Sequence, residues 1–108
     1  MLDKIERYNN LILEELALAL NQEAPLPQAL ITITYVNCSS DLKQAKIGFS
    51  VLPDRLAGTA LRHLKAANTH LVAILKKRLK LRQFPHLIWQ FDSAEREAKK
   101  IESLLKSA

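Results

Sequence analysis

The stretch that decides the fold is residues 30–52, LITITYVNCSSDLKQAKIGFSVL, in which two apolar runs flank a short polar cluster. Residues 30–37 are rich in β-branched side chains, which are enriched in strands. Residues 42–52 alternate more cleanly, and one face of this run carries Ala45, Ile47, Phe49 and Val51. The polar cluster at residues 38–41, CSSD, is typical of a turn. The sequence therefore predicts an antiparallel hairpin of two strands.

Apolar residues recur at helical spacing on both sides of this hairpin. Residues 2–21 predict a first helix, after which two prolines hold the chain extended. Residues 56–81 predict a long helix whose apolar stripe consists of Leu61, Leu64, Leu71, Leu75 and Leu79. Residues 86–92 read as a third strand, and the capping-box spacing of residues 92–95 predicts a last helix. The apolar stripe of that last helix is Ala94, Ala98, Ile101 and Leu105.

Asn68 interrupts the leucine stripe of the long helix. Asparagine tolerates left-handed backbone angles better than most residues, so we expect a kink or break near residues 66–69. The alternative is an uninterrupted helix in which Asn68 is hydrogen-bonded to a neighbour. Because glycine is more permissive still at a bend, Asn68→Gly is expected to be tolerated.

The predicted elements follow one another as α-β-β-α-(kink)-α-β-α. This order predicts an α+β fold, in which a three-stranded sheet packs on helices. No repeat, low-complexity tract or flexible linker divides the 108 residues, and this length is typical of one domain. We therefore expect residues 1–108 to form a single domain.

Basic residues are concentrated in one part of the chain. The net charge is +5, but residues 55–91 alone hold eight basic residues and no acidic one. Such a segment attracts a polyanion, most commonly a nucleic-acid phosphate backbone. A solvated helix face and cations that balance a helix dipole are the structural alternatives. Neither readily accounts for eight bases without a compensating acid.

The candidate phosphate contacts lie mainly where the long helix ends. The basic residues that crowd this end and the loop after it are Lys76, Lys77, Arg78, Lys80 and Arg82. On a helical wheel, Arg62 projects within roughly 40° of Lys76 and Lys80, away from the leucine stripe. Such contacts supply affinity and register but little sequence specificity.

No catalytic or metal-binding pattern stands out in the sequence. His63 and His70 could share a helix face, but no carboxylate accompanies them at helical spacing. Cys38 lacks an evident base and orienting group, so a partly buried loop cysteine is the more natural interpretation. We therefore expect a protein that is not an enzyme and that carries no metal or cofactor.

Cysteine use and hydropathy favour a cytoplasmic location. One cysteine excludes a disulfide within the chain. The first residues, MLDKIER, carry charges where a signal peptide needs an apolar stretch. No run approaches the roughly 20 apolar residues of a membrane span.

The order and motifs of these elements resemble the ribosome-binding factor A family, whose fold is similar to a type-II KH domain. KH domains usually clamp a nucleic-acid backbone with a G-x-x-G loop. This family replaces the loop with a kink that carries an A-x-G pattern. The resemblance rests on ITYV and SDLKQAKI at residues 33–36 and 40–47, LKAAN at 64–68, RLKLRQFPHL at 78–87, and FD and IESLL at 91–92 and 101–105. Asn68 stands where the family's kink has its usual glycine.

The resemblance implies a factor that binds free small (30S) ribosomal subunits late in their maturation. Members of the family assist processing and folding of 16S rRNA near its 5′ end and are released by a GTPase assembly factor. We expect this chain to be a monomer. Carried over to this chain, the kink and the basic run face the RNA. The expected RNA-binding residues are Arg62, Lys65, Ala66, Ala67, Asn68, Lys76, Lys77, Arg78, Lys80 and Arg82.

Two other functions remain open at the level of sequence. A generic KH-like protein would bind many single-stranded RNAs or DNAs without preferring a ribosomal subunit. A protein-interaction adaptor would instead use the basic face to meet an acidic partner. Salt dependence and RNase sensitivity discriminate the three, because neutralised phosphates release counterions.

Overall fold

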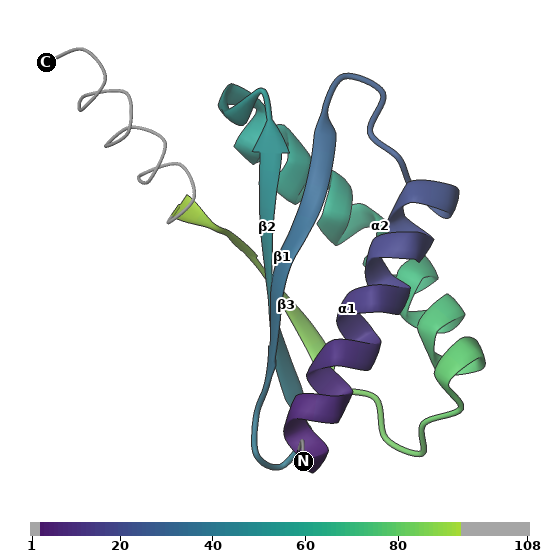
Figure 1. Cartoon of the computed structure of the whole chain (residues 1–108). Helices are drawn as coiled ribbons and strands as arrows, with labels where there is room; N and C mark the ends of the chain where they lie inside the picture. The colour runs from purple at the N-terminus through teal and green to yellow at the C-terminus, as the bar shows by residue number, and fades with distance from the viewer. Residues whose placement is uncertain (1–2, 94–108) are drawn as a thin grey trace, which may run out of the picture.

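The computed structural model describes residues 3–93 and shows one sheet and two helices (Figure 1). In chain order the elements are α1 (Lys4–Glu23), β1 (Leu30–Cys38), β2 (Gln44–Leu52), a single 3-10 turn (Asp54–Leu56), α2 (Ala57–Leu79) and β3 (His86–Phe91). The predicted α+β class is therefore confirmed. The predicted last helix lies outside the described residues.

The three strands are ordered β1-β2-β3 in one sheet. β1 and β2 form the predicted antiparallel hairpin, with a register that runs from Leu30 opposite Leu52 to Cys38 opposite Ala45. β3 pairs with β2 in parallel. A parallel pair needs a long crossover connection, which α2 supplies. The crossover brings the start of β3 next to the hairpin turn, where the His86 N–H donates to the Lys43 carbonyl at 2.9 Å.

The hairpin turn explains why β2 begins later than predicted. Leu42 has a φ of 59°, in the left-handed region, so it belongs to the turn and β2 starts at Gln44. The Asp41 carboxylate accepts hydrogen bonds from the Ser39 hydroxyl at 2.6 Å and the Lys43 N–H at 3.0 Å. Both bonds stabilise the ionised carboxylate and lower the pKa of Asp41 from its ordinary value, and the bond from the Ser39 hydroxyl has the larger effect.

The predicted break in the long helix is wrong. α2 is uninterrupted through residues 66–69. Asn68 Oδ1 accepts a hydrogen bond from Trp89 Nε1 at 3.0 Å, so the polar side chain in the apolar stripe is satisfied without leaving the helix. The helix ends earlier than residue 81, because Lys80 adopts a left-handed φ of 51° and its N–H donates to the Lys76 carbonyl at 3.0 Å.

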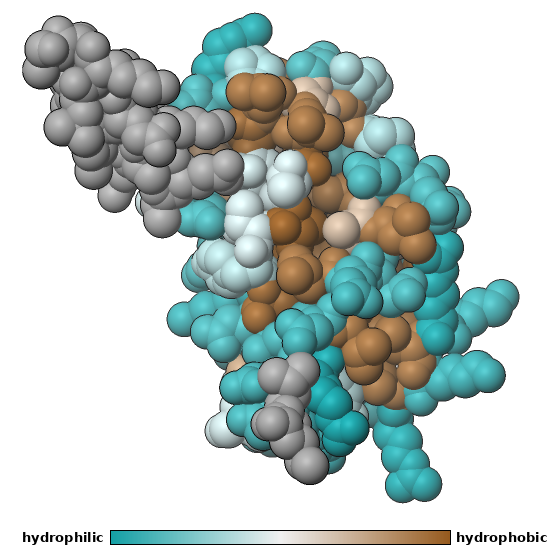
Figure 2. Space-filling view, viewed as in Figure 1, coloured by the Kyte–Doolittle hydropathy of each residue, from teal (hydrophilic) through white to brown (hydrophobic). Residues whose placement is uncertain are grey.

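The helices cover one face of the sheet, and α1 packs mainly on β1 while α2 reaches β3. Alternate strand residues are buried against them, as their period-two pattern requires. The largest fully buried side chains come from β2 and from both helices: Phe49, Ile12, Leu16, Ile47, Leu64, Leu71 and Leu75. Burying each such side chain contributes roughly 1.5–3 kcal/mol. Figure 2 shows that some apolar surface nevertheless stays accessible.

Candidate nucleic-acid interface

The eight basic residues between positions 55 and 91 are all exposed to solvent. Arg55 lies in the 3-10 turn, six follow on α2 and at its C-terminal cap, and Arg82 lies in the loop to β3. No acidic residue lies on α2 or in that loop. The long helix therefore carries basic residues and no acidic residue of its own, and such a charge would attract a polyanion.

The continuous course of α2 places Arg62 and Lys76 on one side of the helix. Without a kink between them, the roughly 40° separation on a helical wheel holds along the whole helix. Lys65 projects on the same side of the helix. The Arg62 guanidinium donates a 3.4 Å hydrogen bond to the Thr59 hydroxyl. We call Arg62, Lys65, Lys76 and Lys80 the outer basic face. Lys77 is exposed at its border, because it follows His70 by seven residues and projects within roughly 20° of that histidine.

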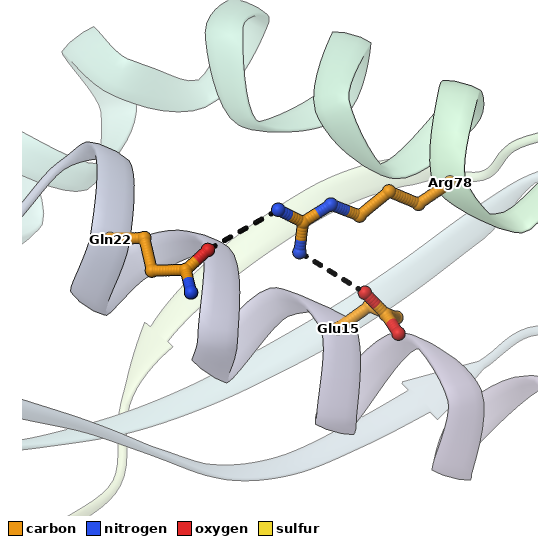
Figure 3. Close-up of polar contacts among 3 residues, drawn as sticks. All are labelled: Glu15, Gln22 and Arg78. Carbon is orange, nitrogen blue, oxygen red and sulfur yellow. Dashed lines mark hydrogen bonds and ion pairs between the residues drawn. The ribbon is translucent and has the colours of Figure 1, made fainter.

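Arg78 is separated from this face although it is adjacent in sequence. Its guanidinium points toward α1, where one nitrogen lies 3.4 Å from Glu15 Oε2 and the other donates to Gln22 Oε1 at 3.2 Å (Figure 3). Arg78 therefore links the two helices through an ion pair and a hydrogen bond to side chains of α1.

Two histidines reinforce the same junction between the helices. The His63 ring lies 2.7 Å from the Ala24 carbonyl, and His70 Nε2 lies 3.8 Å from Glu23 Oε2. Both contacts reach the C-terminal end of α1. The side of α2 that carries His63, His70 and Arg78 thus faces α1, and the outer basic face lies on another side.

The three residues expected at a kink differ in their surroundings. Ala66 is exposed, Ala67 is half-buried and packs against the core, and Asn68 is occupied by its bond to Trp89. They do not form a protruding loop. Asn68 and Lys76 instead lie along a surface groove.

This groove runs between α2 and the start of β3 and encloses about 490 Å³. Its lining residues are Asn68, Thr69, Val72, Ala73 and Lys76 of α2, Phe84, Pro85, His86 and Leu87, and Lys43 of the hairpin turn. Apolar side chains such as Val72 and half-buried Phe84 therefore lie beside the cations Lys43 and Lys76. An apolar surface next to cations suits an unstacked base and its phosphate.

Sequence reasoning missed the contribution of Lys43, Thr69, Phe84 and His86 to this groove. They come from three separate segments, which only the crossover and the His86–Lys43 hydrogen bond bring together. The one local signal was the Phe84-Pro85-His86 turn, which directly follows the basic run.

Catalysis or metal binding would depend first on the thiol, imidazole and carboxylate groups. Cys38 is buried, which raises the pKa of its thiol and disfavours the thiolate a nucleophile needs. Within residues 3–93, no three histidine, cysteine, aspartate or glutamate side chains gather as a metal ion would require. Neither helix in this part of the chain is long and apolar enough to cross a membrane.

Comparison with known proteins relates this arrangement to one family. Residues 4–105 match the family described as ribosome-binding factor A. The ribosome-binding factor A of Brevibacillus brevis is 32% identical, over 95% of this chain and 87% of the relative. That of Thioalkalivibrio sulfidiphilus is also 32% identical, over 97% of this chain and 83% of the relative.

Solved structures give the same result. The crystal structure of ribosome-binding factor A from Thermus thermophilus superposes with a TM-score of 0.67 at 25% identity, over 82% of this chain and 96% of that one. A homology model of the Thermus thermophilus factor, fitted into a cryo-EM map of a 30S complex, also scores 0.67, at 28% identity, over 77% of this chain and 89% of that one. The chain therefore belongs to the ribosome-binding factor A family.

Proposed function

We propose that this protein binds the free small ribosomal subunit late in its maturation, with the outer basic face of α2 turned toward ribosomal RNA. The observation that carries the proposal is the match to ribosome-binding factor A along residues 4–105. The relative fitted into a map of its 30S complex supports the same partner.

The charge distribution supports RNA as the surface that is contacted. Exposed lysines and arginines bind phosphates without reading sequence. On α2 they stand with no acidic residue among them. An acidic protein partner would also meet such a face, but its binding would resist ribonuclease.

The groove indicates how a bound RNA strand would run over the protein. Lys43 and Lys76 flank it, and Phe84 and Val72 supply apolar surface between them. A single-stranded segment that passes along α2 could place its phosphates on the lysines and one unstacked base in the groove. Of the expected contact residues, Arg78 and Asn68 contribute least in this proposal, because both already have protein partners.

The finer parts of the function follow the family resemblance. We propose that the chain acts near the 5′ end of 16S rRNA and assists its processing and folding without catalysing a reaction. It works as a monomer in the cytoplasm, and a GTPase assembly factor releases it.

Co-sedimentation through a sucrose gradient tests the proposal. The protein is mixed with purified small subunits, large subunits or whole ribosomes, each at low and moderate salt. We expect it to sediment with free small subunits at both salt concentrations. It should not sediment with large subunits or whole ribosomes. Equal binding to all three, lost together as salt rises, would instead identify a generic RNA-binding protein.

A further inference from the structure

The open face of the sheet, which is turned away from the helices, carries one aromatic ring. Tyr35, Gly48 and Gln90 stand side by side across β1, β2 and β3 and project from this face. The residues that alternate with them in β2 and β3 face the helices instead. The other aromatic side chains of the three strands belong to the core or pack against it. Within residues 3–93, Tyr35 is therefore the aromatic side chain of the sheet that the open face presents.

The Tyr35 ring lies flat on the backbone of Gly48. A Cβ built on Gly48 would fall nearest to Cε2 of the ring and almost as near to Cδ2 and Cζ, the two atoms bonded to Cε2. A point beyond the edge of the ring would be clearly farther from those two atoms than from Cε2. The Cα–Cβ direction of Gly48 therefore meets one face of the ring. Tyr35 is only half-buried, and the opposite face of its ring is turned away from the sheet.

A hydrogen bond holds the ring in this position. The Tyr35 hydroxyl donates to Gln90 Oε1 at 3.0 Å, so the side chain is fixed by its own strand at one end and by β3 at the other. A ring that is already immobilised loses little conformational entropy when a planar group stacks on it. Because Gln90 uses its oxygen in this bond, its amide nitrogen stands beside the ring as a hydrogen-bond donor.

The surroundings of the ring favour an anionic ligand. Lys46 is exposed on the same face, about 7 Å along β2 from Gly48, between Asn37 of β1 and Ile88 of β3. No residue of the three strands is acidic. A flat ring beside a cation and an amide matches an unpaired nucleobase and its phosphate. An acidic protein segment would match the lysine but would bring no planar group for the ring.

The ring lies within reach of the groove beside α2. His86 lines that groove and is exposed at an outward position where β3 begins. Gln90 follows about 13 Å further along the same strand. β3 is at the edge of the three-stranded sheet, so no further strand of that sheet stands between the groove and the open face. A single strand of RNA can therefore continue from the groove, over β3, to the ring.

We propose that the Tyr35 ring is a stacking platform for one unpaired base of single-stranded RNA, on the face of the sheet opposite α2. Lys46 binds the adjacent phosphate, and the Gln90 amide meets the edge of the base. Stacking on an aromatic ring tolerates any base, so the platform supplies affinity and little selection. The site is separate from the outer basic face and does not depend on which RNA that face contacts.

A nuclear magnetic resonance titration of the full chain with a short unstructured RNA, UUAUU, tests the platform. We expect the ring protons of Tyr35 to shift upfield, because a stacked base places its ring current over them. The amides of Lys46 and Gly48 should shift with the same dependence on RNA concentration. The matched ligand is a ribose-phosphate pentamer without bases, which carries the same phosphates and should leave the Tyr35 ring signals in place.

Three substitutions make the test specific. Tyr35→Thr removes the ring, keeps a residue that favours strands, and should weaken binding of UUAUU roughly tenfold. Tyr35→Phe keeps the ring and should retain most of the affinity. Tyr8→Leu is the control, since the Tyr8 ring also lies near a cation, with Lys4 Nζ 5.9 Å from its centroid, and its loss should leave the affinity unchanged. The amide spectrum of each variant verifies that it is folded.

Three results would overturn the proposal. Equal shifts of the Tyr35 ring with the ligand that lacks bases would mean that only phosphates are bound. A folded Tyr35→Thr protein that binds UUAUU as the wild type does would mean that the ring receives no base. If Tyr35→Thr weakened binding to small subunits while UUAUU left the Tyr35 signals unmoved, the ring would contact a protein of the subunit instead.

Discussion

The hydrogen bond between Asn68 and Trp89 joins the middle of α2 to β3. Trp89 is only 8% exposed, and its indole N–H donates to Asn68 Oδ1 at 3.0 Å. A buried donor that loses its partner costs about 1–3 kcal/mol. The expectation that Asn68→Gly is tolerated therefore no longer holds, because glycine would remove the acceptor and also weaken the helix interior.

Asn68→Ala should lower the free energy of unfolding by about 1–2 kcal/mol, since it leaves the Trp89 N–H without an acceptor while keeping a good helix former. Denaturant unfolding followed by Trp89 fluorescence measures the change. The double variant Asn68→Leu with Trp89→Phe, which removes both polar groups, should recover part of the loss. An Asn68→Ala protein as stable as the wild type would show that the bond contributes nothing.

Lys80 combines a strained backbone with a candidate RNA contact. Its φ of 51° at the C-terminal cap of α2 is a conformation that glycine adopts without cost. Stability and RNA binding can therefore be separated at this residue, because relief of the backbone strain and loss of the cation affect different measurements.

Lys80→Gly should stabilise the fold by up to about 1 kcal/mol and weaken binding to small subunits. The matched control is Lys77→Gly, which removes the same charge from the helical interior and should destabilise by about 1 kcal/mol. Thermal unfolding and small-subunit affinity are measured for both. If Lys80→Gly lowered stability as much as Lys77→Gly, the cap would not carry the strain inferred here.

At the level of elements, the sheet is tied across its open face by one side chain. Tyr35 of β1 reaches over β2 to Gln90 of β3, and its ring occupies the space where a side chain at Gly48 would be. Gly48 is therefore required by close packing. A Cβ at this position would displace the ring and its hydrogen bond.

Gly48→Ala should cost about 1–3 kcal/mol of stability, because the added methyl group overpacks against the Tyr35 ring. Gly58→Ala is the control, since a Cβ there meets only the end of Arg62 at 3.8 Å and adds helix propensity. In a protein that already carries Tyr35→Ser, Gly48→Ala should cause no further loss of stability from overpacking, because the ring that the methyl group would meet is absent. Equal stability of the Gly48 and Gly58 variants in chemical unfolding would rule out the close contact.

The helices and strands could be predicted from the sequence, but several contacts between them could not. The hairpin and the two long helices were predictable because their periodicities lie within each segment. The straight course of α2 was not, since the partner of Asn68 is 21 residues away in β3. Likewise, nothing near Arg78 in sequence indicates that Glu15 and Gln22 of α1 hold it apart from the neighbouring lysines.

At the level of the whole molecule, the fold places the cations that contact α1 and the outer basic face on different sides of α2. α1 supplies the acids that meet one side of α2, namely Glu15 for Arg78 and Glu23 for His70. The outer basic face is on another side of the same helix, and the crossover to β3 sets the groove beside it. The basic segment was evident in the sequence, but its division into structural and exposed cations required the fold.

The affinity of free small subunits for two matched triple variants tests the central claim most directly. Lys76, Lys77 and Lys80 are changed to glutamate in one variant, and Lys4, Arg7 and Arg55, exposed elsewhere, in the other. Both variants have the same net charge, so a difference in affinity reports the position of the charges. We predict that the affinity for small subunits falls roughly tenfold or more for the α2 variant alone. Equal losses in two folded variants, or an unchanged affinity in the first, would contradict the assignment of α2 as the RNA-binding face.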